Sequence, residues 1–368
     1  MQHKGLKSLL VLAFSLFLTV FSVTAFAGEP GHEGGEAKEE GKLDMKEVIF
    51  GHINDSHDFH ILDKVDENGV KHPVSIPLPV ILYSPQKGFS MFMSSKFEHG
   101  HQEFNGYKLV EDGKTVEPVE EGVQVYDFSL TRNVVQMLVA LTLLLVIMLS
   151  IAKKYKAGKG VTSAPKGLQS FVEPVITFVR DEVARPNLGY KADKYLPYLL
   201  TVFFFILINN IFGLIPGTAN VTGNIAFTAV LGVIAFLVIL FSSNKHYWAH
   251  IFNPPGVPLG VKFILIPVEF LSVFIKPFAL IIRLFANMIA GHIIIICLIS
   301  LIFIFGEIKP AIGYGATIVS IPFTIFIYFI EILVAFLQAF IFSMLTAVFI
   351  GQAIEGDHSH DEAHAAHH

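Results

Sequence analysis

Long apolar runs without charge dominate the 368-residue chain from about residue 128 onward. The run over residues 134–151 is long enough for a helix to cross ~30 Å of hydrocarbon at ~1.5 Å per residue. Two more charge-free runs, 196–214 and 225–241, are joined by an uncharged loop. These three runs predict three membrane-spanning helices.

Two further apolar stretches are longer than one crossing requires. Residues 262–305 would measure ~66 Å as one helix, and residues 316–351 would measure ~54 Å. A perpendicular crossing needs about 20 residues. Each stretch is therefore either two short spans or one long tilted helix. Pro267 and Pro277 could divide the first stretch, but proline is tolerated in membrane helices, and we favour two long tilted helices.

The segment before residue 128 has short apolar segments separated by turn residues. Residues 74–82 are apolar but contain two prolines, which is typical of an edge strand. Residues 67–69 and 112–114 have the composition of turns. We therefore predict a small exported β-rich domain over residues 48–127. The fold class is then an all-α polytopic membrane protein over residues 128–354, with about five transmembrane helices and this β-rich domain before it.

The two ends of the chain have different compositions again. Two lysines precede an apolar run, and a small-x-small pattern ends at Ala27. Residues 1–27 are thus predicted to be a cleaved signal peptide, although a first membrane helix that stays attached would have a similar pattern. Residues 28–47 are rich in Gly, Glu and Lys and predict a disordered acidic segment. Residues 355–368 form a His-rich cytoplasmic tail.

The composition supports membrane residence. Hydrophobic residues make up 53% of the chain and charged residues 15%, with a mean hydropathy of +0.59, whereas a soluble domain is about 25% charged. Soluble globular proteins, coiled coils, collagens and nucleic-acid binders are excluded on this ground. The single cysteine, Cys297, excludes an intrachain disulfide.

Charge is distributed unevenly along the chain and indicates its orientation. Residues 28–127 contain 20 acidic and 9 basic residues, a net charge of −11, whereas residues 128–368 contain 11 acidic and 15 basic residues, a net charge of +4. Five lysines and no acid follow the first span, between residues 153 and 166, which marks the cytoplasmic side. The predicted location is a bacterial inner membrane, with the amino-terminal domain exported and the carboxyl terminus cytoplasmic. Residues 167–188 mix charged and apolar positions and predict an interfacial helix.

Each of the two long stretches carries a stripe of polar residues at helical spacing. On the first stretch the stripe residues fall within about 60° of one another at 100° per residue. They are Glu269, Ser272, Lys276, Arg283 and Asn287. The stripe residues of the second stretch are Ser320, Thr324, Tyr328, Glu331 and Gln338. Ionisable side chains in the bilayer cost about 2.5–3.5 kcal/mol or more and usually mark an ion path. A structural Arg–Glu pair between two helices is the alternative.

The chemistry of these residues favours proton transfer. Glu331 and His292 can gain and lose protons near neutral pH in suitable surroundings. Gln338 and Asn287 can hold a chain of water molecules. Arg283 keeps its positive charge, so it cannot carry a proton, but it can force a passing carboxylic acid to ionise and block leakage between two aqueous routes. Such a barrier is useful if a partner moves carboxylates past it.

These residues lie in segments that resemble subunit a of the F-type ATP synthase. Residues 283–292 read RLFANMIAGH and look like the arginine helix of that family, and residues 337–342, LQAFIF, resemble its last-helix motif. Glu269 precedes Arg283 by fourteen residues, as in the family. The resemblance covers about residues 128–354 and leaves the exported domain unexplained.

The resemblance implies a stator subunit that offers two aqueous half-channels to a rotating ring of c subunits. Arg283 would then face the ring carboxylates. One half-channel would be lined by His292, Glu331 and Gln338 together with Asn224. The other would contain Glu269 and Ser272. The implied partners are the c-subunit ring, b-type peripheral stalk subunits and the lipid bilayer. No cofactor, resident metal, nucleic acid or directly bound nucleotide is expected, because ATP is made elsewhere in such a complex.

The histidines leave other functions open. A His-rich metal-cation transporter would use the tail histidines, but it should also place several His or Asp ligands within the spans, where the sequence has His292. His57, Asp58 and His60 form a conceivable metal site in the exported domain. A haem- or quinone-binding subunit would need histidine pairs on facing helices. The sequence also leaves open whether the coupled ion is H⁺ or Na⁺.

Overall fold

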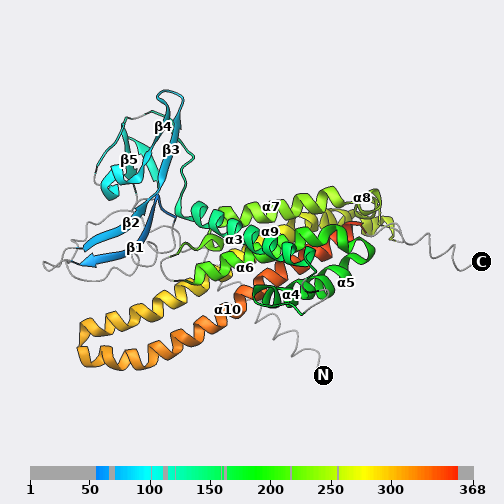
Figure 1. Ribbon diagram of the computed structural model, residues 1–368. Helices are drawn as coiled ribbons and strands as arrows, with labels where there is room; N and C mark the ends of the chain where they lie inside the picture. The colour runs from blue at the N-terminus through cyan, green and yellow to red at the C-terminus, as the bar shows by residue number, and fades with distance from the viewer. Residues whose placement is uncertain are drawn as a thin grey trace, which may run out of the picture. The chain divides into compact units, whose positions relative to one another are not determined.

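The computed structural model separates a β-rich part from a helical part (Figure 1). The signal peptide, the acidic segment and the His-rich tail predicted from the sequence lie outside the residues it describes. The described residues are 55–354, except for 66–70, 101, 111–114, 121, 159, 161–163, 216–217 and 255–256.

The described strands before residue 128 form three small antiparallel sheets. The two-stranded sheets are β1 (Asp58–Val65) with β2 (Lys71–Pro77) and β5 (Tyr107–Val110) with β6 (Thr115–Pro118). The three-stranded sheet has the order β4-β3-β7, formed by Gly88–Met93, Pro79–Ser84 and Tyr126–Asp127. The predicted turns at 67–69 and 112–114 lie among residues that the structure does not describe. In each case the strands before and after them pair with each other.

The segment 74–82 belongs to two sheets, so the prediction of one edge strand there is wrong. β2 ends at Pro77 and β3 begins at Pro79, and the intervening Leu78 bonds to Ser94 instead of a neighbouring strand. Its N–H donates to Ser94 Oγ at 3.0 Å and its carbonyl accepts from Ser94 N at 2.9 Å. β3 is the central strand of its sheet, and Pro79 is compatible with this because it occupies the first position.

Side chains along β3 point alternately to its two faces, and one of these faces packs into a small hydrophobic core. Val80 and Leu82 are fully buried and pack with Phe97, Tyr107 and Leu109. A 3-10 helix, Ser94–Gly100, supplies Phe97 to this cluster. The β-rich part therefore has its own hydrophobic core.

The helical part contains five segments that are long and apolar enough to cross a membrane, within the described residues. This confirms the predicted number of about five. The longer helices are α3 (Arg132–Lys156), α6 (Ala192–Leu214), α7 (Ile225–Ser242), α9 (Leu259–Ile308) and α10 (Pro310–Ile354). The shorter ones are α4 (Leu168–Phe178), α5 (Arg185–Leu188) and α8 (Lys245–Phe252).

Helices α9 and α10 are each continuous, which confirms single long helices over pairs of short spans. They contain 50 and 45 residues and are separated by Lys309 alone. Pro267 and Pro277 lie inside α9 without ending it. Figure 1 shows α9 and α10 side by side as an antiparallel hairpin.

The region predicted as an interfacial helix is helical but irregular. A π-helical segment, Val179–Ala184, joins α4 to α5, and a 3-10 turn at Gly189–Lys191 joins α5 to α6. Gly189 has a φ of +53°, which glycine adopts without steric cost, at the point where the chain turns into α6. Val179 and Val183 are fully buried, so this region packs on the bundle through the π-helical segment.

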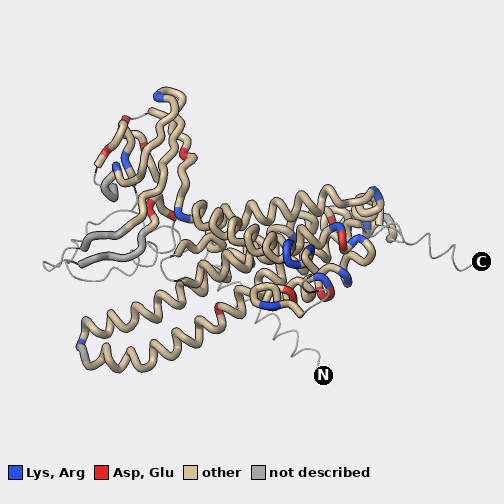
Figure 2. The backbone as a smooth tube through the Cα atoms, in the orientation of Figure 1, with Lys and Arg blue, Asp and Glu red and all other residues tan. Residues whose placement is uncertain are grey.

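Charged residues are sparse along the long helices. Figure 2 shows extended stretches of α9 and α10 without charge and a concentration of charge near α4, α5 and α8. The inner face of α10 carries small residues such as Ala335, Ala339 and Ala347, all fully buried. Small residues let helix backbones approach closely in membranes. The polar groups on this inner face of α10, such as Glu331 and Gln338, therefore lie in a tightly packed apolar environment.

Candidate functional site

The polar stripe of α10 shares one face, as the spacing predicts, and that face is turned to the interior of the bundle. Glu331 is 7% exposed and Gln338 is 4% exposed. Ser320 and Thr324 are also buried, and Tyr328 is half-buried. The helical spacing thus places a carboxyl, an amide and two hydroxyl groups on one packed face.

Glu331 lies directly against Gly291 of α9. A Cβ atom built on Gly291 would overlap the Glu331 carboxylate, so a larger residue here would push that carboxylate aside. His292 is the next residue on α9 and is half-buried. The acid and the imidazole that the sequence singled out therefore lie at the same level of two adjacent helices.

One oxygen of Glu331 is buried without a partner. Its Oε2 atom has no hydrogen bond from any described residue. A buried oxygen of this kind needs a proton or water to offset its lost hydration. Glu331 is thus positioned as a group that exchanges protons or binds water.

Several other buried polar atoms of the bundle also have no partner among the described residues. They are Asn209 Oδ1, Asn210 Oδ1, Thr222 Oγ1, Thr324 Oγ1 and Ser343 Oγ. The Nδ2 atom of Asn210 donates to the carbonyl of Ala335 on α10 at 3.2 Å. Buried polar groups with spare acceptors are where ordered water binds in proteins. The sequence did not identify Asn210, whose signal is a polar residue in the middle of an apolar run.

The loop between α6 and α7 is fixed to two other helices. The side-chain amide of Gln136, on α3, donates to the carbonyl of Ala219 and accepts from its N–H at 2.7 Å. Asn220 Nδ2 donates to the carbonyl of Met288 on α9 at 3.4 Å. The loop is therefore held against α9 one turn before His292, and sequence reasoning missed the role of Gln136.

Asn224 caps α7. Its Oδ1 accepts a hydrogen bond from Ala226 N at 2.9 Å, which satisfies one of the free N–H groups at the start of the helix. Among the described residues, no hydrogen bond joins Asn224 to Glu331. The structure thus places Asn224 at the end of the fixed loop, where α7 begins.

Arg283 and Asn287 lie on an exposed face of α9. Within the described residues, the Arg283 guanidinium has neither a hydrogen bond nor an ion pair. Glu331 contacts Gly291, which is eight residues or ~12 Å further along α9. Among the described residues, no Arg–Glu pair therefore joins the two helices.

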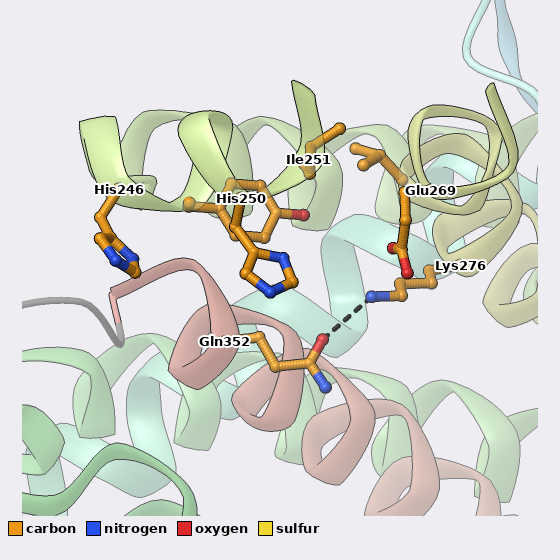
Figure 3. A pocket seen from close by; sticks show the side chains of 8 residues that line it. His246, His250, Ile251, Glu269, Lys276 and Gln352 are labelled. Atoms are coloured by element: carbon orange, nitrogen blue, oxygen red, sulfur yellow. Dashed lines mark hydrogen bonds between the residues drawn. The ribbon is translucent and has the colours of Figure 1, made fainter. Parts of the chain in front are cut away.

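Glu269 and Lys276 of α9 line part of a cavity of about 270 Å³ between α8, α9 and α10. Figure 3 shows side chains from α8 and α9 directed into this cavity. The Nζ atom of Lys276 donates to Gln352 Oε1 at 2.9 Å. The lining residues are His246, Tyr247, His250, Ile251, Glu269, Val273, Lys276 and Gln352.

Two histidines of this cavity were not identified from the sequence. His246 and His250 are four residues apart on α8, so they share one face of that helix. Burial, followed by the nearby charge of Glu269, raises the pKa of Tyr247 above its ordinary value of 10.0.

Ser272 is half-buried on α9 but is not among the lining residues.

Residues 134–351 match the protein family described as ATP synthase A chain. The chain belongs to this family. The resemblance stated from the residue motifs is thereby confirmed. Residues 48–135 match a second family, which is described as a domain of unknown function, DUF8433.

Relatives of the A-chain family support the same assignment. A protein named ATP synthase subunit a from Chloroherpeton thalassium is 45% identical over 244 residues, which cover 65% of this chain and 71% of the relative. One named ATP synthase subunit a 2 from Prosthecochloris aestuarii is 47% identical over 247 residues, which cover 66% of this chain and 73% of the relative. The chain is thus a multi-pass membrane protein of the A-chain family.

Two of the three residues of the conceivable metal site, His57 and Asp58, have described side chains, and each contacts another residue of the β-rich part. His57 Nε2 lies 2.8 Å from Asp127 Oδ2, and Asp58 accepts a hydrogen bond from Ser94 Oγ. The side chain of His60 lies outside the described set. Across the described part of this A-chain protein, no group of three His, Cys, Asp or Glu residues has the geometry of a metal site.

The contact with His57 has an electrostatic consequence for Asp127. Burial raises the pKa of Asp127, but hydrogen bonds from His57 and Ser129 outweigh this effect, and the pKa lies below its ordinary value of 3.8. Asp127 therefore stays ionised over the physiological pH range and holds His57 in place.

Proposed function

We propose that this chain is the proton-translocating stator subunit of an F-type ATP synthase. It would offer two aqueous half-channels to a rotating ring of c subunits, with Arg283 between them. The observation that carries the proposal is the exposed guanidinium of Arg283 on an apolar helix, where no described residue pairs with it. An unpaired charge is costly at membrane depth, so a carboxylate on another chain is its natural partner.

The first half-channel would pass Glu331. The close contact of Glu331 with Gly291 beside His292 supports a relay between an acid and an imidazole. Gln338 lies two turns away on the same buried face and can order water along the route. The unpaired oxygens of Asn209 and Asn210 supply further sites for water. Asn224, at the end of the fixed loop, would contribute to the mouth of this half-channel.

The second half-channel would pass Glu269 on the cytoplasmic side. The cavity of about 270 Å³ is large enough for several water molecules and reaches Glu269 and Lys276. Ser272 lies one turn from both residues on α9 and would extend the polar wall toward Arg283. Asn287 would do the same on the other side of Arg283.

The fixed charge of Arg283 explains how two separate half-channels couple ion flow to rotation. A protonated ring carboxyl would lose its proton as it approaches Arg283, because a nearby cation favours the ionised form. A guanidinium does not release its own proton at any physiological pH, so protons would not pass directly from one half-channel to the other. Net transfer would then require the ring to turn.

The proposal extends to location and partners. The chain would reside in a bacterial inner membrane with its amino-terminal domain exported, after removal of the signal peptide. Its partners would be the c-subunit ring and b-type stalk subunits. The cluster of lysines at the end of α3, with Lys153, Lys154 and Lys156 in the last helical turn, supports this orientation. No observation favours the alternative of a metal-cation transporter.

Replacing Arg283 tests the proposal. Arg283→Ala should abolish ATP synthesis driven by an imposed proton gradient in membrane vesicles, and ATP hydrolysis by the released soluble sector should persist. Lys309→Ala removes another exposed cation and should leave synthesis near the wild-type rate. Retained proton-driven synthesis in the Arg283 variant would overturn the proposal. Repeating the assay with a sodium gradient identifies the coupled ion.

A further inference from the structure

The β4-β3-β7 sheet has one face that nothing in the described chain covers. Val80 and Leu82 point into the core from β3, so the alternate residues of the strand point to the opposite face. On that face Phe89 and Met91 are each 68% exposed. Large apolar side chains are seldom this exposed in a group unless the face contacts something else.

The uncovered face is a regular array of nine residues, hereafter the apolar face. Strand pairing aligns them in three rows across β4, β3 and the chain of β7. Past the end of β7, the sheet pairing continues because Phe128 N donates to Ile81 O at 2.9 Å and Leu130 N donates to Pro79 O at 3.2 Å. The rows are Phe89–Tyr83–Tyr126, Met91–Ile81–Phe128 and Met93–Pro79–Leu130.

The chemistry of the apolar face is that of a membrane interface. None of its nine residues is charged, although acidic residues outnumber basic ones in this part of the chain. Its polar groups are the hydroxyls of Tyr83 and Tyr126, and tyrosine is enriched where hydrocarbon meets water. A face that remained in water would be expected to carry lysine or glutamate at some of these positions.

The apolar face is also joined to a membrane-spanning helix without a flexible linker. Leu130 belongs to its last row, and Arg132 begins α3. Arg132 N donates to Ser56 O at 2.9 Å, which fixes the connection. At ~3.3 Å per residue the last row lies ~7 Å from the helix start, which is about the thickness of the polar layer on one side of a bilayer.

The size of the apolar face argues against a protein partner. Three rows ~7 Å apart on strands ~4.8 Å apart cover roughly 300 Å². A stable protein–protein interface buries about 800 Å² on each partner. Adsorption to lipid needs no such minimum, because the helix already holds the domain at the membrane.

We infer that the apolar face rests on the lipid surface of the leaflet in which α3 begins, with Phe89 and Met91 inserted among the lipids. This contact would hold the β-rich domain on the bilayer and constrain the angle at which α3 enters it. The inference requires that α3 spans a membrane and is independent of the proposed half-channels.

Depth-dependent fluorescence quenching tests this contact in the full chain. The single tryptophan is replaced by Trp248→Phe, and Phe89→Trp or Met91→Trp then reports on the apolar face. The proteins are reconstituted in phosphatidylcholine vesicles that contain brominated phosphatidylcholine. The matched control is Lys108→Trp, at an exposed position of β5 outside the apolar face.

We expect brominated lipid to quench the reporters at positions 89 and 91 at least about twofold and to leave the reporter at position 108 near its unquenched intensity. Acrylamide in the water should show the reverse preference. Strong acrylamide quenching without lipid quenching at both positions 89 and 91 would show a face in water and overturn the inference. Protection from both quenchers would show a protein cover, from this chain or a partner, and would overturn it as well.

Discussion

Glu331 and Glu269 are two carboxyl groups on the same helical hairpin, and their surroundings are opposite. Glu331 is buried against Gly291 of the facing helix, with one oxygen unpaired in the described chain. Glu269 lines an open cavity that also contains two histidines and Lys276. In the proposed half-channels the two groups would therefore be unequally replaceable: a proton passing Glu331 would have few other groups to use, whereas a proton passing Glu269 would have several.

The largest expected effect is the contrast between the two substitutions Glu331→Gln and Glu269→Gln. Glu331→Gln should reduce proton-driven ATP synthesis by about 100-fold, the usual contribution of a positioned proton-transfer group. Glu269→Gln should reduce it only a few-fold, because water and the imidazoles of His246 and His250 remain in the cavity. Initial rates of ATP synthesis in vesicles at a fixed proton gradient measure both effects. Equal losses of rate in the two variants would show that Glu331 is no harder to replace than Glu269.

The packing on the Glu331 side can be disturbed without removing the carboxyl group. Gly291→Ala introduces a methyl group where the carboxylate lies, so it should displace Glu331 and lower proton-driven synthesis, with little loss of hairpin stability because the carboxylate ends a flexible side chain. Gly315→Ala is the matched control, because a Cβ atom there meets nothing within 4 Å. Thermal unfolding in detergent and proton-driven synthesis measure the two consequences. A Gly291 variant as active as the Gly315 variant would contradict the close contact.

The loop near the Glu331 side should be sensitive to Gln136. Gln136→Leu leaves the N–H and carbonyl of Ala219 without partners, which costs about 1–3 kcal/mol when both are buried. Thr142→Val on the same helix removes a hydroxyl that bonds to its own helix, to Leu138 O at 2.8 Å, and should cost less. Hydrogen exchange of the 218–224 segment should increase in the first variant and not in the second.

Asp127 is a third carboxyl group, and it differs from both others because its partners are fixed. Its pKa lies below 3.8 in the folded chain, so it stabilises the β-rich part fully above that value and loses this contribution as the pH falls through the folded pKa. Acidification below about pH 4 should therefore reduce the hydrogen-exchange protection of β3, after correction for intrinsic rates. Asp127→Asn should show a smaller change over the same pH range. An identical pH dependence in both proteins would exclude this contact as its source.

Much of the helical part could be predicted from the sequence by itself. Apolar run length predicted the five spans, because a helix in lipid must satisfy its own backbone and be about 20 residues long. Helical spacing correctly assigned the α10 stripe to one face, and the motif around Arg283 led to the right family. These features depend on residues close together in the chain, so they can be predicted without knowing which other helices pack against them.

Only the tertiary structure determined which element, if any, packs against each face of a helix or strand. Spacing placed Arg283 and Glu269 on one stripe of α9, but packing against α8 and α10 leaves Arg283 exposed and puts Glu269 in the wall of a cavity. Likewise, the division of residues 74–82 between two sheets depends on Ser94, sixteen residues after Leu78. Periodicity describes the direction of a side chain relative to its own element, whereas its burial and partners depend on elements distant in the sequence, and only the folded chain brings those together.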